Sequence, residues 1–347
     1  MPKIQTLRGM NDIGPTEAKE WSQVELTLQS ILESYGYEEI RFPIVEKTEL
    51  FTRSNEAADI VTKEMYTFED KSGESISLRP EGTAGCVRAA IDNDLLRTDK
   101  PRLWYSGPMF RYERPQKGRS RQFHQFSAEV FGLNTPAVDV ELITASASFW
   151  KAFGIYEDVT LEINNLGDDR ARSNYVKELV DFLNGKLDDI DDDTRRKLKE
   201  NPLRILDSKS KKIQEILNEA PIIEDFVTQS SKDYHNELLS MLDELNIAYE
   251  VNSKLVRGLD YYNQTVFEWK TGLLGSQDTI LGGGRYDNLV EELGGKSCPA
   301  VGFSIGLERL ILLLREKDRI NLLNKLDIYF ICLCEKSARK AIIIGEQ

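Results

Sequence analysis

The sequence predicts an α+β fold built around an antiparallel sheet flanked by helices. Strand-like segments follow one another as hairpins: a turn at residues 70–73 joins two short ones, and a polar loop separates 103–113 from 122–131. Few segments have the strand–helix–strand order that a parallel sheet requires. Between about residues 165 and 247 the chain becomes polar and helix-rich, which predicts a helical unit inserted into the sheet domain.

Length and composition describe a globular protein of two or three domains. The chain has 347 residues, against roughly 100–200 for one domain. With 40% hydrophobic and 30% charged residues, it is neither collagen-like, disordered nor a disulfide-rich miniprotein. A net charge of −13 argues against a generally basic nucleic-acid binder but permits a local basic patch. Four cysteines without a signal peptide predict a cytoplasmic protein, and no apolar run reaches the ~20 residues of a membrane span.

The remaining elements are predicted from periodicity and from Gly or Pro at their ends. A helix over 16–35, with Thr16 as its N-cap, stops at Gly36, and a strand over 39–44 carries Pro43 near its end. The predicted elements beyond the insertion are strands at 248–252, 261–270 and 299–305, and a helix at 307–315.

A third unit is predicted to begin near the end of the chain. An apolar strand over 326–334 precedes a helix over 336–344, and Cys332 and Cys334 would lie on one face of that strand. A zinc site is the weaker interpretation, because neither histidine of the chain is near these thiols in sequence.

The polar loop between the two long strand-like runs is strongly basic. Residues 111–121 contain five basic side chains and one acidic one, a local charge of +4, and Pro115 and Gly118 mark a loop tip. Arginine pairs bidentately with phosphate oxygens, so this loop suits a polyanion. The alternative is a solvated hairpin, but a protein this acidic needs no such loop for solubility.

Three further segments carry polar groups suited to a ligand. In the strand after the loop, alternation places Gln125 and Glu129 together on one face, where a carboxylate needs either a ligand or an arginine as partner. Residue Glu81 ends a strand just before a predicted helix that Thr83 could cap. Residues 282–284 form a predicted triple-glycine turn that matches neither the Rossmann nor the P-loop pattern.

Taken together, these segments resemble the histidyl-tRNA synthetase family, a class II aminoacyl-tRNA synthetase family, in its bacterial type. The resemblance runs in the family's order from residue 1 to about 325. It rests on an N-terminal signature at 8–12, motif 1 near 41–51 with Arg41-Phe42-Pro43, motif 2 near 103–131, histidine signatures at 255–262 and 282–287, and motif 3 near 299–315.

The resemblance implies a domain organisation, a reaction and partners. A class II catalytic domain over 1–325 would be interrupted by the insertion at about 165–247, and 326–347 would begin an α/β anticodon-binding domain. The implied enzyme is a cytoplasmic homodimer without membrane attachment. It converts L-histidine and ATP, with Mg²⁺ bound mainly through phosphates, into histidyl-adenylate, and then charges tRNA(His).

The resemblance also implies residue roles. Arg111 and Arg257 would hold the α-phosphate and the histidine carboxylate from opposite sides, as the catalytic pair. The remaining implied ATP ligands are Glu113, Arg119 and Arg309, and Gln116 and Arg119 would contact the tRNA acceptor end. The other implied histidine ligands are Glu81, Gly82, Thr83 and Gln125 around the α-amino group and Glu129, Tyr261 and Tyr262 around the imidazole.

One alternative keeps the fold without the reaction. A catalytically inactive paralogue of this family binds histidine and regulates ATP phosphoribosyltransferase, and it lacks the anticodon-binding domain. The length of the chain fits that protein. The intact set of phosphate-binding positions, Arg111, Gln116, Arg119 and Arg309, favours the synthetase.

Overall fold

The computed structural model describes every residue except 1–2, 54–57, 98, 276–277, 321–328 and 347. Its centre is an eight-stranded sheet in the order β1-β5-β6-β11-β10-β9-β7-β8. All neighbours pair antiparallel except β1 with β5 and β7 with β8, so the predicted antiparallel sheet is confirmed. The strands are β1 (Glu38–Glu39), β5 (Arg102–Phe110), β6 (Gln122–Phe131), β7 (Thr160–Asn165), β8 (Glu250–Val251), β9 (Asn263–Lys270), β10 (Thr279–Arg285) and β11 (Ala300–Gly306).

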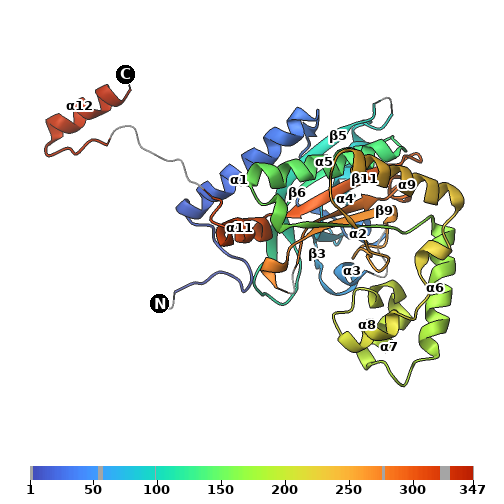
Figure 1. Ribbon diagram of the computed structural model, residues 1–347. Coiled ribbons are helices and arrows are strands. Elements are labelled where there is room, and N and C mark those ends of the chain that lie inside the picture. Colours follow the sequence, from blue (N-terminus) through green and yellow to red (C-terminus); the bar gives the residue numbers. More distant parts are fainter. Residues whose placement is uncertain (1–2, 54–57, 98, 276–277, 321–328, 347) are drawn as a thin grey trace.

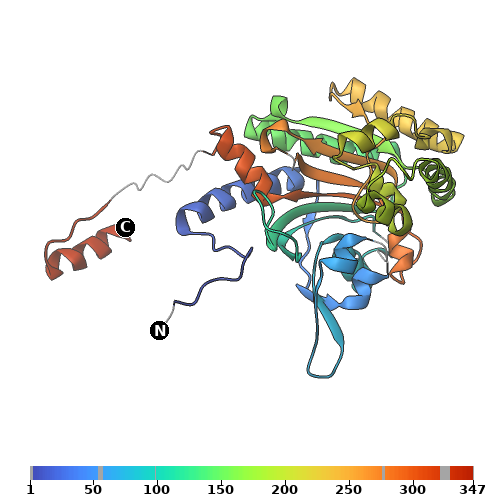
Figure 2. The same cartoon turned by 90° about the horizontal axis from the view of Figure 1, so that it is seen from below.

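Long helices cover one face of this sheet (Figures 1 and 2). They are α1 (Pro15–Ser34), α5 (Pro136–Phe153), α9 (Gln229–Glu244) and α11 (Leu307–Glu316). Their apolar stripes bury Phe126, Ala128 and Val130 of β6 in one core, as period-two alternation requires. The first helix begins at Pro15 rather than after a Thr16 cap, since Pro favours the first helical position.

The opposite face carries a second core and shorter elements. Here lie α4 (Thr83–Asp92), α10 (Leu289–Glu292) and the inserted helices α6 (Asp169–Asn184), α7 (Asp192–Glu200) and α8 (Lys211–Leu217), with the 3₁₀ turn η2 (Pro202–Ile205). The inserted helices share this core with Tyr261, Tyr262 and Tyr286. In contrast, Leu238 and Leu242 place α9 in the first core, against α5. Helices α6, α7 and α8 therefore pack on the face on which the predicted site residues lie, whereas α9 of the same segment packs on the other face.

A small second sheet and several short elements complete the described chain. The sheet has the order β2-β4-β3, and the predicted hairpin around residues 70–73 forms two of its strands. The elements are β2 (Val45–Lys47), α2 (Thr48–Thr52), α3 (Asp59–Lys63), β3 (Tyr66–Glu69), β4 (Ser75–Leu78), η1 (Tyr156–Asp158), η3 (Ile223–Asp225), η4 (Gly272–Leu274) and α12 (Glu335–Gly345).

One strand prediction and one turn prediction are wrong in an informative way. The predicted strand at 39–44 pairs only over β1; beyond Pro43, which has no N–H to donate, the chain joins the small sheet as β2. The triple glycine at 282–284 is not a turn but lies inside β10, where Gly283 faces Phe303 of β11. An added Cβ on Gly283 would meet Phe303 Cβ at 2.8 Å, so close strand packing, and not chain reversal, requires this glycine.

The predicted C-terminal strand is also wrong over its described part. Residues 321–328 lie outside the described chain, and residues 329–334 form no strand, since no described segment pairs with them. Cys332 and Cys334 are exposed free thiols there. The predicted helix is present as α12, which lies apart from the sheet and has no buried residue (Figure 2). Across the described part of the chain, no helix is both long and apolar enough to cross a membrane.

A buried ion pair joins the two halves of the chain through the sheet. Arg285 on β10 donates to Asp139 on α5 over 2.5 Å, and both side chains are fully buried. The same guanidinium donates to the hydroxyl of Tyr234 on α9 and to the carbonyl of Leu133. Burial raises the pKa of Asp139 to about 6, an effect that Arg285 opposes. One arginine thus ties β10, α5 and α9 together.

We expect Arg285→Met to lower the free energy of unfolding by about 3–5 kcal/mol, because Asp139 would be left as an uncompensated buried charge. Urea titration followed by tryptophan fluorescence measures this change. The double variant Arg285→Met/Asp139→Leu should recover most of the loss. As a control, Arg315→Met breaks only half-exposed pairs with Glu17 and Glu20 and should cost about 1 kcal/mol or less. An equal loss from both arginines would contradict the assignment.

Candidate active site

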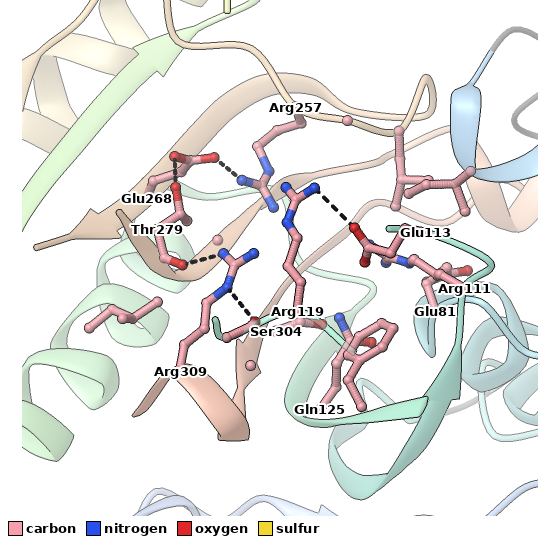
Figure 3. A pocket seen from close by; sticks show the side chains of 18 of the residues that line it. Glu81, Arg111, Glu113, Arg119, Gln125, Arg257, Glu268, Thr279, Ser304 and Arg309 are labelled. Carbon is pink, nitrogen blue, oxygen red and sulfur yellow. Dashed lines mark hydrogen bonds and ion pairs between the residues drawn. The ribbon is translucent and has the colours of Figure 1, made fainter. Parts of the chain in front are cut away.

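A cavity of about 760 Å³ opens on the face of the sheet that the insertion adjoins. Residues from β6, β9, β10 and β11 form its floor, and segments from the basic loop and the insertion form its sides. Five arginines line it. Arg204 reaches it from the insertion, and the four labelled in Figure 3 are Arg111 and Arg119 of the basic loop, Arg257 of the segment before β9, and Arg309 of α11. Such a concentration of guanidinium groups in one cavity favours a ligand with several anionic oxygens.

The N-terminus of α4 is capped by a buried acid. The carboxylate of Glu81 accepts hydrogen bonds from the backbone nitrogens of Thr83 at 2.6 Å and Ala84 at 2.9 Å, so it satisfies two free donors of the first helical turn. Burial nevertheless raises the pKa of Glu81. Thr83 is the first helical residue and not the cap, and its hydroxyl is free to donate elsewhere.

The Thr83 hydroxyl is one of three hydroxyl groups that donate to the carboxylate of Glu129. Thr83 and Tyr105 donate to Oε1 of Glu129 at 2.9 and 2.8 Å, and Tyr286 donates to Oε2. The carboxyl group lies against Gly302 of the neighbouring strand, where any side chain would overlap it. Burial raises the pKa of Glu129 to about 7, although the three hydroxyls lower it. Glu129 does not line the cavity but lies behind its wall, with both carboxyl oxygens held by hydroxyl donors.

Gln125 lies on the same face of β6, four residues before Glu129, and lines the cavity itself. Its amide oxygen is buried and has no hydrogen-bond partner among the described residues. An unpaired buried acceptor costs about 1–3 kcal/mol, so a ligand that donates a hydrogen bond there would relieve that cost.

Carboxylates hold two of the cavity arginines in place. Arg257 pairs with Glu268 of β9, whose other oxygen accepts from the hydroxyl of Thr279 at 2.8 Å. The guanidinium of Arg257 lies where a side chain on Gly282 would be, which explains the first glycine of β10. Arg119 pairs with Glu113 at 3.0 Å across the basic loop.

Backbone carbonyls hold two more of these arginines. Arg111 donates from Nε to the carbonyl of Pro80 at 2.8 Å and stacks on Phe123, and its burial lowers its pKa. Arg309 donates to the carbonyls of Gly118 at 3.3 Å and Thr279 at 2.6 Å, so it connects the basic loop to β10. Burial, followed by the nearby charge of Arg119, lowers the pKa of Arg309.

The structure brings most of the predicted site residues together. Those that line the cavity are Glu81, Thr83, Arg111, Glu113, Arg119, Gln125, Arg257, Tyr261, Tyr262 and Arg309. Three do not line it: Gly82 packs under the ring of Tyr105, Gln116 lies in the basic loop, and Glu129 lies behind the wall.

Sequence reasoning missed several lining residues. Glu268 and Thr279 line the cavity but belong to no recognisable sequence motif. Alternation along β9 was the one available signal, because it places Glu268 on a buried face of the strand. Arg204 and Lys209 reach the cavity from the insertion, and no sequence signal links them to the sheet. Among the described residues, no group of three or more His, Cys, Asp or Glu side chains is arranged to hold a metal ion.

Comparison with known proteins places this arrangement in context. The sequence model of the family described as histidyl-tRNA synthetase matches residues 9–310. The apo histidyl-tRNA synthetase of S. aureus is 36% identical, with a TM-score of 0.79, over 99% of this chain and 82% of that one. The predicted resemblance and the class II fold are thereby confirmed.

Two more distant structures share the fold alone. A protein of Bacillus halodurans C described as an ATP phosphoribosyltransferase regulatory subunit/histidyl-tRNA synthetase is 20% identical, with a TM-score of 0.73, over 100% of this chain and 90% of that one. The histidyl-tRNA synthetase of Nostoc sp. PCC 7120 is 19% identical, with a TM-score of 0.69, over 99% of this chain and 83% of that one.

We expect the burial of Glu129 to make the wild type lose stability as the pH rises. Above its unfolded pKa of about 4.3, the unfolded chain releases the proton that the native carboxyl keeps until pH reaches about 7. The native state is therefore progressively disfavoured across that window, and the penalty is constant above it. Glu129→Gln carries no such proton, and its amide can accept from Thr83 and Tyr105 while donating to Tyr286.

Urea titrations of both proteins at pH 5 and pH 8 measure this effect. Relative to Glu129→Gln, the wild type should lose about 2 kcal/mol of unfolding free energy between these pH values. A pH dependence that is the same in both proteins would rule out titration of Glu129.

Proposed function

The chain belongs to the histidyl-tRNA synthetase family, and from that premise we propose that it activates L-histidine with ATP and transfers the histidyl group to tRNA(His). The observation that carries this proposal is the convergence of five arginines on one cavity that also contains a buried, unpartnered acceptor at Gln125. Amino-acid activation needs both features: cations for the phosphates and a carboxylate, and an acceptor for an ammonium group.

The first step needs alignment and not a protein nucleophile. The histidine carboxylate attacks the α-phosphorus of ATP, and pyrophosphate leaves with the electrons of the broken P–O bond. Arg111 and Arg257 reach the cavity from different segments, the basic loop and the segment before β9, so both can share the charge that grows on the α-phosphate. Because each is already held by an acceptor, neither has to be ordered when the substrate binds. Arg309, with Arg119 and Glu113 beside it, would bind the rest of ATP.

Histidine would bind between Gln125 and the tyrosine pair. The Gln125 amide oxygen and the edge of Glu81 would accept from the α-ammonium group, with Thr83 and Gly82 at the start of α4. Tyr261 and Tyr262 would contact the imidazole. Glu129, which accepts from the Thr83 hydroxyl, would supply the negative charge that complements the imidazole. A site built to pair both ring nitrogens discriminates against apolar analogues, which leave those groups unpaired.

The residues present fit ATP carried with Mg²⁺. The cavity is large enough for a nucleotide, and its carboxylates at Glu113 and Glu268 are oxygen donors of the kind that Mg²⁺ takes. Bound Mg²⁺ would neutralise charge on the phosphates. Gln116 and Arg119 would contact the acceptor end of the tRNA. The enzyme would be a homodimer in the cytoplasm.

The strongest test of the reaction is ATP–pyrophosphate exchange measured with each amino acid in turn. Exchange that depends on histidine alone would support the synthetase. Histidine binding by calorimetry without exchange would instead indicate the regulatory paralogue and overturn the proposal.

Arg257→Ala should slow histidine-dependent exchange by about 10²–10³-fold, because a donor aimed at the developing phosphate charge is removed. The dissociation constant of histidine, measured by calorimetry, should change much less. Exchange at the wild-type rate in this variant would contradict the role of Arg257.

Gln125→Leu should raise the KM for histidine by about 10–100-fold while the KM for ATP stays within about twofold, since the acceptor for the ammonium group is lost. Gln122→Leu is the matched control, because Gln122 begins the same strand but does not line the cavity. Equal effects from both variants would point to damage to the strand and not to substrate binding.

A further inference from the structure

The segment 257–262, called here the Arg257 loop, is a thin wall between two cavities. On one side lies the candidate active site. On the other lies a cavity of about 250 Å³ between the loop and the inserted helices, lined by Arg172, Asn201 and Leu203 among others. Arg257, Leu259 and Tyr262 line both cavities. Because the rear of the loop is incompletely packed, its position depends on hydrogen bonds.

Those hydrogen bonds come from the insertion. Nη1 of Arg172 on α6 donates to the carbonyls of Asp260 at 2.8 Å and Tyr262 at 2.6 Å. The amide of Asn201, between α7 and η2, donates to the Asp260 carboxylate at 2.8 Å. Arg204 in η2 donates to the carbonyl of Gly258 at 3.2 Å.

Arg172, the central member of this group, is itself held in place. It pairs with Asp169 one helical turn earlier at 3.5 Å, and Asp169 accepts from the side chain of Asn288 at 2.6 Å. Asp168 caps the same helix through the backbone nitrogen of Ala171 at 2.8 Å. Charge-assisted bonds from a fixed and half-buried guanidinium are among the stronger hydrogen bonds in proteins.

Side-chain packing holds the C-terminal end of the loop, because the buried rings of Tyr261 and Tyr262 contact the ring of Tyr286. Residues 257–262 belong to no helix or strand, and the ion pair with Glu268 fixes only the end of the Arg257 side chain. The exposed pairs Lys63–Glu200 and Lys209–Asp278, which also join the insertion to the rest of the chain, are separated by 3.5 and 3.7 Å and contribute little. The Arg257 loop therefore receives its side-chain hydrogen bonds from the insertion, which also lines the cavity with Arg204 and Lys209.

We propose that Arg172, assisted by Asn201 and Arg204, is a positioning residue: it holds the backbone of the Arg257 loop so that Arg257 and Tyr262 face the substrates. This role rests on the proposed function, and it makes amino-acid activation depend on the placement of the insertion. A shift of the insertion would move these two side chains together with Arg204 and Lys209, which line the cavity from the insertion itself.

The test compares Arg172→Met with Arg172→Lys and with Arg170→Met in the full chain. Arg170 is an exposed residue on the first turn of the same helix and serves as the matched control. Arg172→Met should lower kcat of histidine-dependent exchange by about 10–100-fold and raise the KM for histidine, with the KM for ATP within about twofold. Arg172→Lys, which keeps a cationic donor, should recover part of the loss, and Asn201→Ala should show a smaller loss of the same kind.

A second measurement separates this proposal from the proposed function. Hydrogen–deuterium exchange of peptides covering 257–262 should be faster in Arg172→Met than in the wild type and in Arg170→Met, while peptides from β6 and β11 remain unchanged. Unchanged exchange in 257–262, or kinetics equal to those of Arg170→Met, would overturn the positioning role. If the wild type shows no histidine-dependent pyrophosphate exchange, the proposed function fails, yet the deuterium measurement still decides whether Arg172 holds the loop.

Discussion

The cost of removing charged side chains from water is the constraint on which this structure depends. One face of the sheet buries carboxylates and guanidinium groups at close quarters, and each needs a partner there. The carboxylate of Glu81 accepts from backbone nitrogens at the N-terminus of a helix, and that of Glu129 accepts from three hydroxyls. The guanidinium of Arg257 pairs with Glu268. The partners come from segments far apart in sequence, so the ionic groups cannot be satisfied unless strands, helix and loop are all in place.

Two glycines, Gly282 of β10 and Gly302 of β11, follow from the same constraint. A charged side chain that lies flat on a sheet occupies the space of its neighbour's Cβ, and so Glu129 requires Gly302 and Arg257 requires Gly282. On the opposite face, where α1, α5, α9 and α11 pack, the strands carry large apolar residues. Gly282 and Gly302 thus mark positions where a charged side chain lies on the cavity face of the sheet, whereas Gly283 makes room for Phe303 in the helix-side core.

Patterns local in sequence were predictable, whereas relations between distant segments were not. Alternation along 122–131 fixes the bounds of β6 and the shared face of Gln125 and Glu129. The glycines at 282–284 were misread as a turn, because their reason is contact with strands and an arginine that periodicity does not reveal. Glu268 was missed because its partner is eleven residues away across a loop. The resemblance predicts which residues belong to the site. It does not predict which of them line the cavity and which, such as Glu129, lie behind its wall.

The four arginines labelled in Figure 3 already have partners in the protein, and this determines what the site can bind. Arg119 and Arg257 each face a carboxylate, while Arg111 and Arg309 donate to backbone carbonyls. These contacts fix each guanidinium before a ligand arrives, which removes an entropic cost from binding. They also use only some of the five N–H donors of each arginine, so phosphate oxygens can share a guanidinium without displacing its partner. An isolated arginine cluster would repel itself, whereas arginines held by acceptors can converge on one polyanion and keep the geometry that in-line attack demands.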